Sequence, residues 1–222
     1  MNLQSKNSGS GIAYDTTKGN LGDLKDTDNA EPLMKELDTT KKAKDGLFRK
    51  YWSNGQLRYE WEYKDGERAD GTSKSWWPNG KLKQTISWKD GKVDGLSTQW
   101  DENGQKEDEC NYKNGKKDGL WTQWYDNGQK SLEVTYKNGE KDGLWIIWYL
   151  NGQKKYEIIY KDGKLDGLVT WWYDNGRKEI EGTYKNNKED GLWTQWYDNG
   201  QKSLEVTYKD GKLKRRIYEF TE

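Results

Sequence analysis

The chain has 222 residues, no histidine, and a formal net charge of zero from 38 basic and 38 acidic side chains. This balance argues against a nucleic-acid partner and against electrostatic adhesion to anionic membranes, because both need a basic excess. Only 31% of the residues are hydrophobic, but 14 Trp and 15 Tyr predict a thin aromatic core rather than a disordered chain.

The N-terminal segment, residues 1–44, contains no Trp and is rich in Gly, Ser, Asp, Thr and Lys. We predict a mostly disordered polar leader, with about one helical turn at residues 32–37. No stretch of the sequence has the length and apolar character of a signal or transmembrane segment. We therefore expect a cytoplasmic protein as the sequence is written, and a surface or secreted protein if its start has been trimmed.

Tandem repeats follow the leader. Asp-Gly and Asn-Gly pairs each recur seven times, with one step of 25 residues and five of 24. Each unit has two short runs rich in Trp, Tyr, Thr, Leu and Val around Asn-Gly, which is the strongest local signal for a β-hairpin. We predict an all-β fold, an elongated antiparallel sheet or solenoid of seven tandem hairpins stacked side by side. The predicted units are 45–69, 70–93, 94–117, 118–141, 142–165, 166–189 and 190–213, and a capping strand follows at 214–222.

The register within a unit is predicted from its loop. A three-residue loop, Asp126-Asn127-Gly128, with the glycine in the left-handed conformation, would place Leu120 and Trp124 on one face with Val134. Cys110 occupies the position of Val134 and is therefore expected to be a small core residue. The predicted core rows are Leu47, Leu96, Leu120, Leu144, Leu168 and Leu192; Tyr51, Trp76, Trp100, Trp124, Trp148, Trp172 and Trp196; and Tyr63, Trp88, Tyr112, Tyr136, Tyr160, Tyr184 and Tyr208.

The opposite face then carries a second set of aromatic residues. Either the sheet curls so that this set is covered, or the set forms an exposed interaction surface, for which Trp and Tyr are the preferred anchors. The candidate binding residues are Trp52, Trp77, Trp121, Tyr125, Trp145, Ile147, Tyr149, Trp171, Tyr173, Trp193 and Tyr197.

The residue types argue against an enzyme. Without histidine the usual Ser-His and Cys-His nucleophiles and the usual zinc ligands are missing, so we expect no metal and no cofactor. Glutamates recur at one repeat position, where interleaved lysines should neutralise them on a solvent-facing ladder: Glu60, Glu109, Glu133, Glu157, Glu181 and Glu205.

The pattern Asp-Gly-Leu-x-x-x-Trp-Tyr-x-Asn-Gly-Gln, over residues 45–213, resembles the MORN-repeat variant of bacterial proteins grouped as the YwqK-like antitoxin family. It departs from the eukaryotic MORN consensus, which has a shorter period and a His-Gly pair. The resemblance implies an elongated sheet of successive hairpins and a non-enzymatic scaffold that binds a protein partner. For some members the implied role is that of an antitoxin or immunity protein, with a toxin as the partner.

Two alternatives remain open at the level of sequence. Stacked aromatic rings also suit sugars or quaternary ammonium groups, so a cell-surface protein that binds glycan or choline is one alternative. Membrane-lipid association of the MORN type is the other, although the balanced charge does not favour it.

Overall fold

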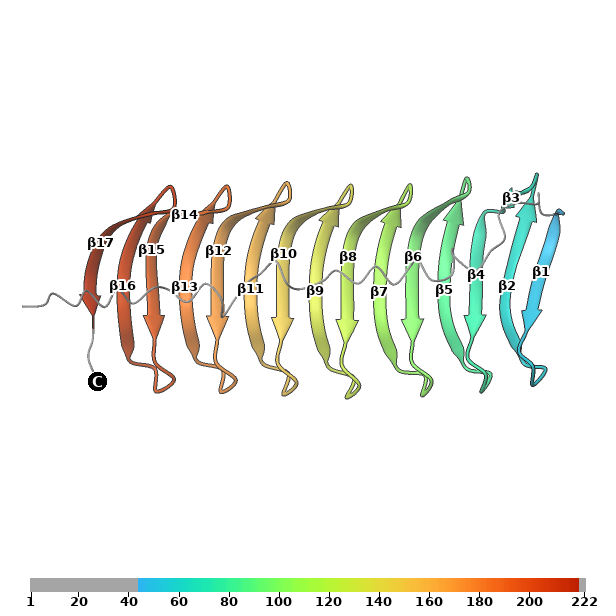
Figure 1. Cartoon of the computed structure of the whole chain (residues 1–222), viewed down its shortest axis with the longest axis horizontal. Helices are drawn as coiled ribbons and strands as arrows, with labels where there is room; N and C mark the ends of the chain where they lie inside the picture. The colour runs from blue at the N-terminus through green and yellow to red at the C-terminus, as the bar shows by residue number, and fades with distance from the viewer. Residues whose placement is uncertain (1–43, 220–222) are drawn as a thin grey trace, which may run out of the picture. The chain divides into compact units, whose positions relative to one another are not determined.

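The computed structural model describes residues 44–219, so the predicted helical turn at 32–37 and nearly all of the predicted leader lie outside the described residues. Within this range every regular element is a β-strand, and the 17 strands form one antiparallel sheet (Figure 1). The prediction of an all-β sheet of tandem hairpins is confirmed.

The strands follow one another across the sheet in sequence order (Figure 1). In the second and seventh units the first strand is split, so that a two-residue strand precedes a six-residue strand. The strands are β1 (Gly46–Tyr51), β2 (Leu57–Lys64), β3 (Glu67–Arg68), β4 (Gly71–Trp76), β5 (Leu82–Lys89), β6 (Lys92–Trp100), β7 (Lys106–Lys113), β8 (Lys116–Trp124), β9 (Lys130–Lys137), β10 (Glu140–Trp148), β11 (Lys154–Lys161), β12 (Lys164–Trp172), β13 (Lys178–Lys185), β14 (Lys188–Glu189), β15 (Gly191–Trp196), β16 (Lys202–Lys209) and β17 (Lys212–Glu219).

The Asn-Gly loop between β8 and β9 has the predicted length. Tyr125 donates its backbone N–H to the carbonyl of Gln129 at 2.8 Å, and Gly128 donates to the carbonyl of Tyr125 at 2.8 Å. These two bonds enclose a three-residue loop in which Gly128 has a φ of 80°, the left-handed conformation that glycine adopts at little cost. The loop prediction is therefore confirmed.

The predicted assignment of the faces is wrong, because a bulge follows the loop. Trp124 pairs with Lys130, but the next pair is Gln123 with Leu132, so that β9 holds one extra residue. One extra residue exchanges the two faces of everything beyond it. As a result Trp121, not Leu120, lies opposite Val134. The same register shift occurs beside the Asn-Gly loop in every unit.

We call the side of the sheet that carries Trp121 and Val134 the packed face, and the opposite side the leucine face. The predicted leucine row is not core: its members are 39–55% exposed. In the predicted Trp row Tyr51 is 58% exposed, and the tryptophans are only half-buried. The predicted Tyr row does lie on the packed face, where Trp88 and Tyr136 are buried.

The centre of the packed face is one row of alternating large and small side chains. Trp121 lies between Cys110 and Val134 on the neighbouring strands, and Trp145 lies between Val134 and Ile158. The expected burial of Cys110 is confirmed, since it is 2% exposed. A bulky ring beside short aliphatic chains fills space at the density that protein interiors require.

A second irregularity bends each unit at its Asp-Gly pair. Between β9 and β10, Lys141 pairs with Tyr136 but the next pair is Trp145 with Val134, which leaves two extra residues in β10. Gly143 there has a φ of 120°, which other residues rarely adopt. Lys141 Nζ lies 4.5 Å from the ring centroid of Trp145, although four residues of straight strand span about 13 Å. The bend therefore brings a lysine stem over the buried indole.

The turn between β9 and β10 is a tight two-residue turn. Asn138 and Gly139 both have positive φ, 53° and 91°, as a type I′ turn requires. Asp118 accepts a hydrogen bond from the backbone N–H of Asn138 at 3.0 Å. The aspartate of the Asp-Gly pair thus holds the tight turn of its own unit.

Candidate binding surface

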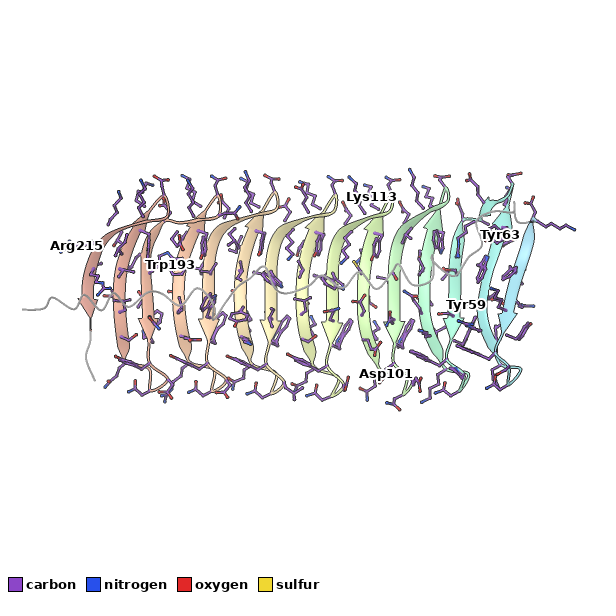
Figure 2. All side chains as sticks on the ribbon, viewed as in Figure 1. Tyr59, Tyr63, Asp101, Lys113, Trp193 and Arg215 are labelled. Atoms are coloured by element: carbon purple, nitrogen blue, oxygen red, sulfur yellow. The ribbon has the colours of Figure 1, made fainter. Side chains whose placement is uncertain are left out.

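The structure divides the predicted binding residues into buried, linking and half-buried groups. Trp121, Trp145 and Trp193 belong to the packed face and are only 2%, 2% and 4% exposed. Figure 2 shows Trp193 on the body of the sheet, whereas Asp101 and Lys113 lie at its two long edges. These three tryptophans are buried within the sheet and are not part of an exposed surface.

In five of the units an aromatic residue at the start of the Asn-Gly loop links that unit to the next. The indole N–H of Trp52 donates to the carbonyl of Trp76 at 3.0 Å, and that of Trp77 donates to the carbonyl of Trp100 at 2.9 Å. The hydroxyls of Tyr125, Tyr149 and Tyr173 make the same link at 2.7, 2.8 and 2.8 Å, to the carbonyls of Trp148, Trp172 and Trp196. Desolvation by burial raises the pKa of Tyr149 to about 12. These side chains therefore have a structural role between hairpins.

The remaining candidates are half-buried. Ile147 pairs with Leu132 and Tyr156 on the packed face. Trp171 lies edge-on to Tyr156, with 5.6 Å between ring centroids, and its indole N–H is buried without a hydrogen-bond partner. Tyr197 occupies the same loop position in the last unit and is also half-buried.

A half-buried carboxylate on the packed face was not predicted from the sequence. Asp108 accepts hydrogen bonds from the indole N–H of Trp121 at 2.6 Å and from the side-chain amide of Gln123 at 3.1 Å. Desolvation by burial nevertheless raises the pKa of Asp108 above its usual range. Aligning the repeats could have revealed this site. Asp108 stands at the position that Leu132 and Ile180 occupy in later units, and an aspartate at an apolar position of the repeat is unusual.

The leucine face carries the surface that the sequence prediction placed inside. Its leucine row consists of residues that share one repeat position and that are each more than a third exposed: Leu47, Leu96, Leu120, Leu144, Leu168 and Leu192. Between Leu144 and Leu168 lies Ile159, which is 38% exposed. The row would have been recognised as exposed only if the bulge after each loop had been known.

The glutamate ladder is neutralised on this same face. Each glutamate from the third to the seventh unit forms an ion pair with the lysine three residues before it, and Arg49 pairs with Glu60 at 2.7 Å. The predicted neutralisation by lysine is confirmed. The ladder is less solvent-facing than expected, since Glu205 is only 9% exposed.

Two further features are absent from residues 44–219. This part of the chain holds no helix that is long and apolar enough to span a membrane. In the same range, no three Cys, Asp or Glu side chains gather where they could hold a metal ion.

The geometry defines the class of protein: an open antiparallel sheet of tandem hairpins, most of them linked to the next by a loop aromatic and a loop asparagine. The model of the MORN repeat variant family matches the chain seven times, and the chain therefore belongs to that family. MORN repeats typically form non-enzymatic scaffolds. A comparison with curated proteins gives no match. The matched residues are 44–65, 69–90, 93–114, 117–138, 141–162, 165–186 and 189–210.

Proposed function

We propose that this chain is a non-enzymatic scaffold that binds a protein partner along the leucine row. The observation that carries the proposal is the exposure of these leucines, 39–55% each, at one repeated position. Soluble monomers rarely leave a continuous apolar strip in water, and such strips commonly mark interaction sites.

The dimensions of the row suit a protein rather than a small molecule. Leu120 pairs with Thr135 and Leu144 pairs with Ile159, so uncharged side chains continue between the leucines. Successive leucines are two strands apart, about 10 Å, and the row from Leu96 to Leu192 extends about 40 Å. A strip of this length needs a width of about 20 Å to reach the roughly 800 Å² that each partner buries in a standard interface.

The units differ in ways that would give a partner specificity. On the leucine face the third unit places Asn111 opposite its leucine, the fourth places Thr135 there and the fifth places Ile159. Because the units are not identical, a partner can distinguish one position along the sheet from the others. The more specific role that we propose, an antitoxin or immunity protein with a toxin as partner, rests on the resemblance to the YwqK-like family.

The non-enzymatic part of the proposal rests on side-chain chemistry. The chain has no histidine, the repeated glutamates from the third to the seventh unit are paired with lysines, and Cys110 is buried. Nucleophiles and general bases need a reactive group that is free to meet the substrate, whereas these glutamates are held in ion pairs and the thiol is buried. Binding of sugar or choline would need exposed ring faces, which Trp121, Trp145 and Trp193 do not offer.

The test is affinity capture with the full chain from the lysate of its native cell. Leu120→Lys and Leu144→Lys place two charges in the row, and we expect loss of a stoichiometric protein that the wild type captures. Since both leucines are 39–42% exposed, the sheet should remain folded.

The matched control is Leu150→Lys, because Leu150 is 62% exposed but lies in a loop outside the row. Capture that survives the row substitutions, or that is lost equally with the control, contradicts the proposal. If the captured protein inhibits growth when expressed alone and is harmless with this chain, the antitoxin role is supported; if it is harmless alone, that role is excluded.

A further inference from the structure

A cavity lies where the first unit meets the second. It measures about 130 Å³, roughly ten times the volume that one water needs, and side chains of both faces line it. Leu47, Glu60 and Glu62 contribute from the first unit, and Thr72, Ser73 and Trp88 contribute from the second. Leu47 also belongs to the leucine row, but the rest of the row, from Leu96 to Leu192, does not line the cavity.

Three sequence differences explain why a cavity forms at this junction. Ala69 is the extra residue of the one 25-residue step. Thr72 stands where the other six units carry leucine, and Ser73 stands where the fourth, fifth and seventh units carry tryptophan. Each difference removes volume or widens the connection, and together they account for the space at this junction.

The cavity is lined by a cation whose hydrogen bonds are incomplete. The guanidinium carbon of Arg68 lies 4.9 Å from the ring centroid of Trp61 and 4.5 Å from that of Trp88, and the Nη2 atom is buried without a hydrogen-bond partner. Desolvation lowers the pKa of Arg68, as expected for a charge that burial disfavours. A buried charged donor without an acceptor is costly, and an anion beside it would relieve that cost.

The charges around the cavity limit the kind of anion. Glu60 is paired with Arg49 at 2.7 Å, and Asp70 accepts a backbone hydrogen bond from Asp90 at 2.7 Å. Glu62 is exposed and adds a further negative charge. A dianion such as phosphate would meet repulsion from these carboxylates, whereas a single carboxylate carries less charge and matches the two-pronged geometry of a guanidinium.

We infer that the Arg68 cavity is a binding site for one carboxylate group, with Trp61 and Leu47 contacting the apolar part of the ligand. The carboxylate belongs either to a small free acid or to the C-terminus of a polypeptide. Arg68 holds it by charge-assisted hydrogen bonds, and the extra residue Ala69 keeps the space open.

The experiment follows the indole N–H of Trp88 and the backbone amides of residues 68–73 by NMR, with the full chain at constant ionic strength. Sodium acetate and N-acetylglycine are the probes, and inorganic phosphate and chloride are the comparators. We expect saturable shifts confined to these signals, with a dissociation constant on the order of 10 mM for acetate, as a single ion pair in a small pocket allows. Tenfold tighter binding of N-acetylglycine would identify a polypeptide C-terminus as the source, and equal binding would identify a small free acid.

Four variants make the result decisive. Arg68→Met keeps the apolar stem between the indoles and should weaken acetate at least tenfold, whereas Lys117→Met, at the equivalent position of the third unit, should change nothing. Deletion of Ala69 restores the 24-residue step and should also abolish binding, so the test does not depend on the folding of one variant. Glu62→Gln should tighten binding about threefold, because it removes a like charge. Equal shifts in Arg68→Met, shifts spread over the whole sheet, or phosphate binding as tightly as acetate would overturn the inference.

Discussion

Trp193 and Gly182 show how single residues are matched across neighbouring strands. A Cβ atom added to Gly182 would lie 2.2 Å from the Trp193 ring, far inside van der Waals contact. The glycine is buried, so the ring fills the space above it. On the packed face, the size of one residue therefore sets the size allowed to its neighbour on the next strand.

The first prediction follows from this match. Gly182→Val should destabilise the chain by about 3 kcal/mol, because overpacking of a filled core forces side chains and backbone apart. Trp193→Val in the same chain should restore much of the loss, since Val169 already packs beside Ile158 in this way one unit earlier. Urea unfolding of both single variants and the double variant measures the coupling. Additive losses would show that the two residues do not share one space.

The second prediction concerns Asp108. Because its pKa is raised in the folded state by desolvation, the folded chain holds this proton more tightly than the unfolded chain does. Stability from this group is complete below the unfolded pKa, near 4, and is lost as the pH rises through the folded value. Asp108→Asn keeps an oxygen for Trp121 and should raise the melting temperature at pH 7 but not at pH 3.5.

Asp101 provides the opposite case as a control. Hydrogen bonding from the Gln105 backbone N–H lowers the pKa of Asp101. Its contribution is present above the unfolded pKa and is lost on acidification, so Asp101→Asn should lower the melting temperature at pH 7 and have no effect at pH 2. If both variants respond to pH in the same direction, burial is not what perturbs Asp108.

At the scale of the element, the hairpin was predictable except for one residue. Asn-Gly and Asp-Gly pairs marked every turn, and the loop around Gly128 was predicted with its length and its left-handed glycine. The extra residue at Ser131 was not predictable, because no glycine or proline marks the bulge and the aromatic pattern fits both registers. The choice is physical: Trp121 removes more apolar area from water than Leu120 does, so the register that buries it is favoured.

The same error explains what could be predicted of the candidate site. The second set of Trp and Tyr residues was expected to form a surface because the sequence prediction placed it on the face opposite the core. The bulge after each loop exchanges the two faces, so several of these residues are buried instead. The leucine row and the Arg68 cavity depend on register and on one inserted residue, which repeat composition alone does not reveal.

The third prediction tests how adjacent hairpins are linked at their loops. The side-chain amide of Asn127 donates to the carbonyl of Leu150 in the next unit at 2.9 Å, while its oxygen accepts from the Gln129 N–H at 3.0 Å. Asn127→Ala should therefore cost about 1–2 kcal/mol, the usual value of one or two such bonds. The control is Asn103→Ala, because the Asn103 amide donates to Asp101 within its own loop, at 3.4 Å. Urea unfolding should show a smaller loss for the control, and equal losses would mean that the link between units adds nothing.

At the scale of the described sheet, stability is expected to accumulate from one unit to the next. Residues 118–137 and 190–209 have the same sequence and the same register, with Trp121 opposite Val134 and Trp193 opposite Val206. The two units differ in the hydrogen bond that the preceding unit offers to the indole. Asp108 accepts a hydrogen bond from the indole N–H of Trp121, whereas the indole N–H of Trp193 is buried without a partner. The sequence of a unit therefore determines the register of its hairpin, and the adjacent unit contributes to its free energy of unfolding, as in other linear repeats.

The fourth prediction removes one unit. Deletion of residues 118–141 joins Lys117 to Asp142 and places Trp145 beside Cys110 and Asp108, where Trp121 now lies. The unpartnered indole N–H of Trp145 would then gain the carboxylate of Asp108 as an acceptor. The shortened sheet should fold, lose about 10 Å of length by small-angle scattering, and show a urea m-value lower by about one seventh, because the m-value follows the surface exposed on unfolding.

Its control is deletion of residues 118–137, which is out of phase with the repeat. This deletion joins Lys117 to Asn138, so a tight turn stands where a strand should continue, and the hairpins on either side lose their common register. Circular dichroism should show a folded sheet for the in-phase deletion and loss of cooperative unfolding for the other. Collapse of both would mean that the sheet folds as one indivisible unit, because a sum of neighbour contacts would tolerate the in-phase loss.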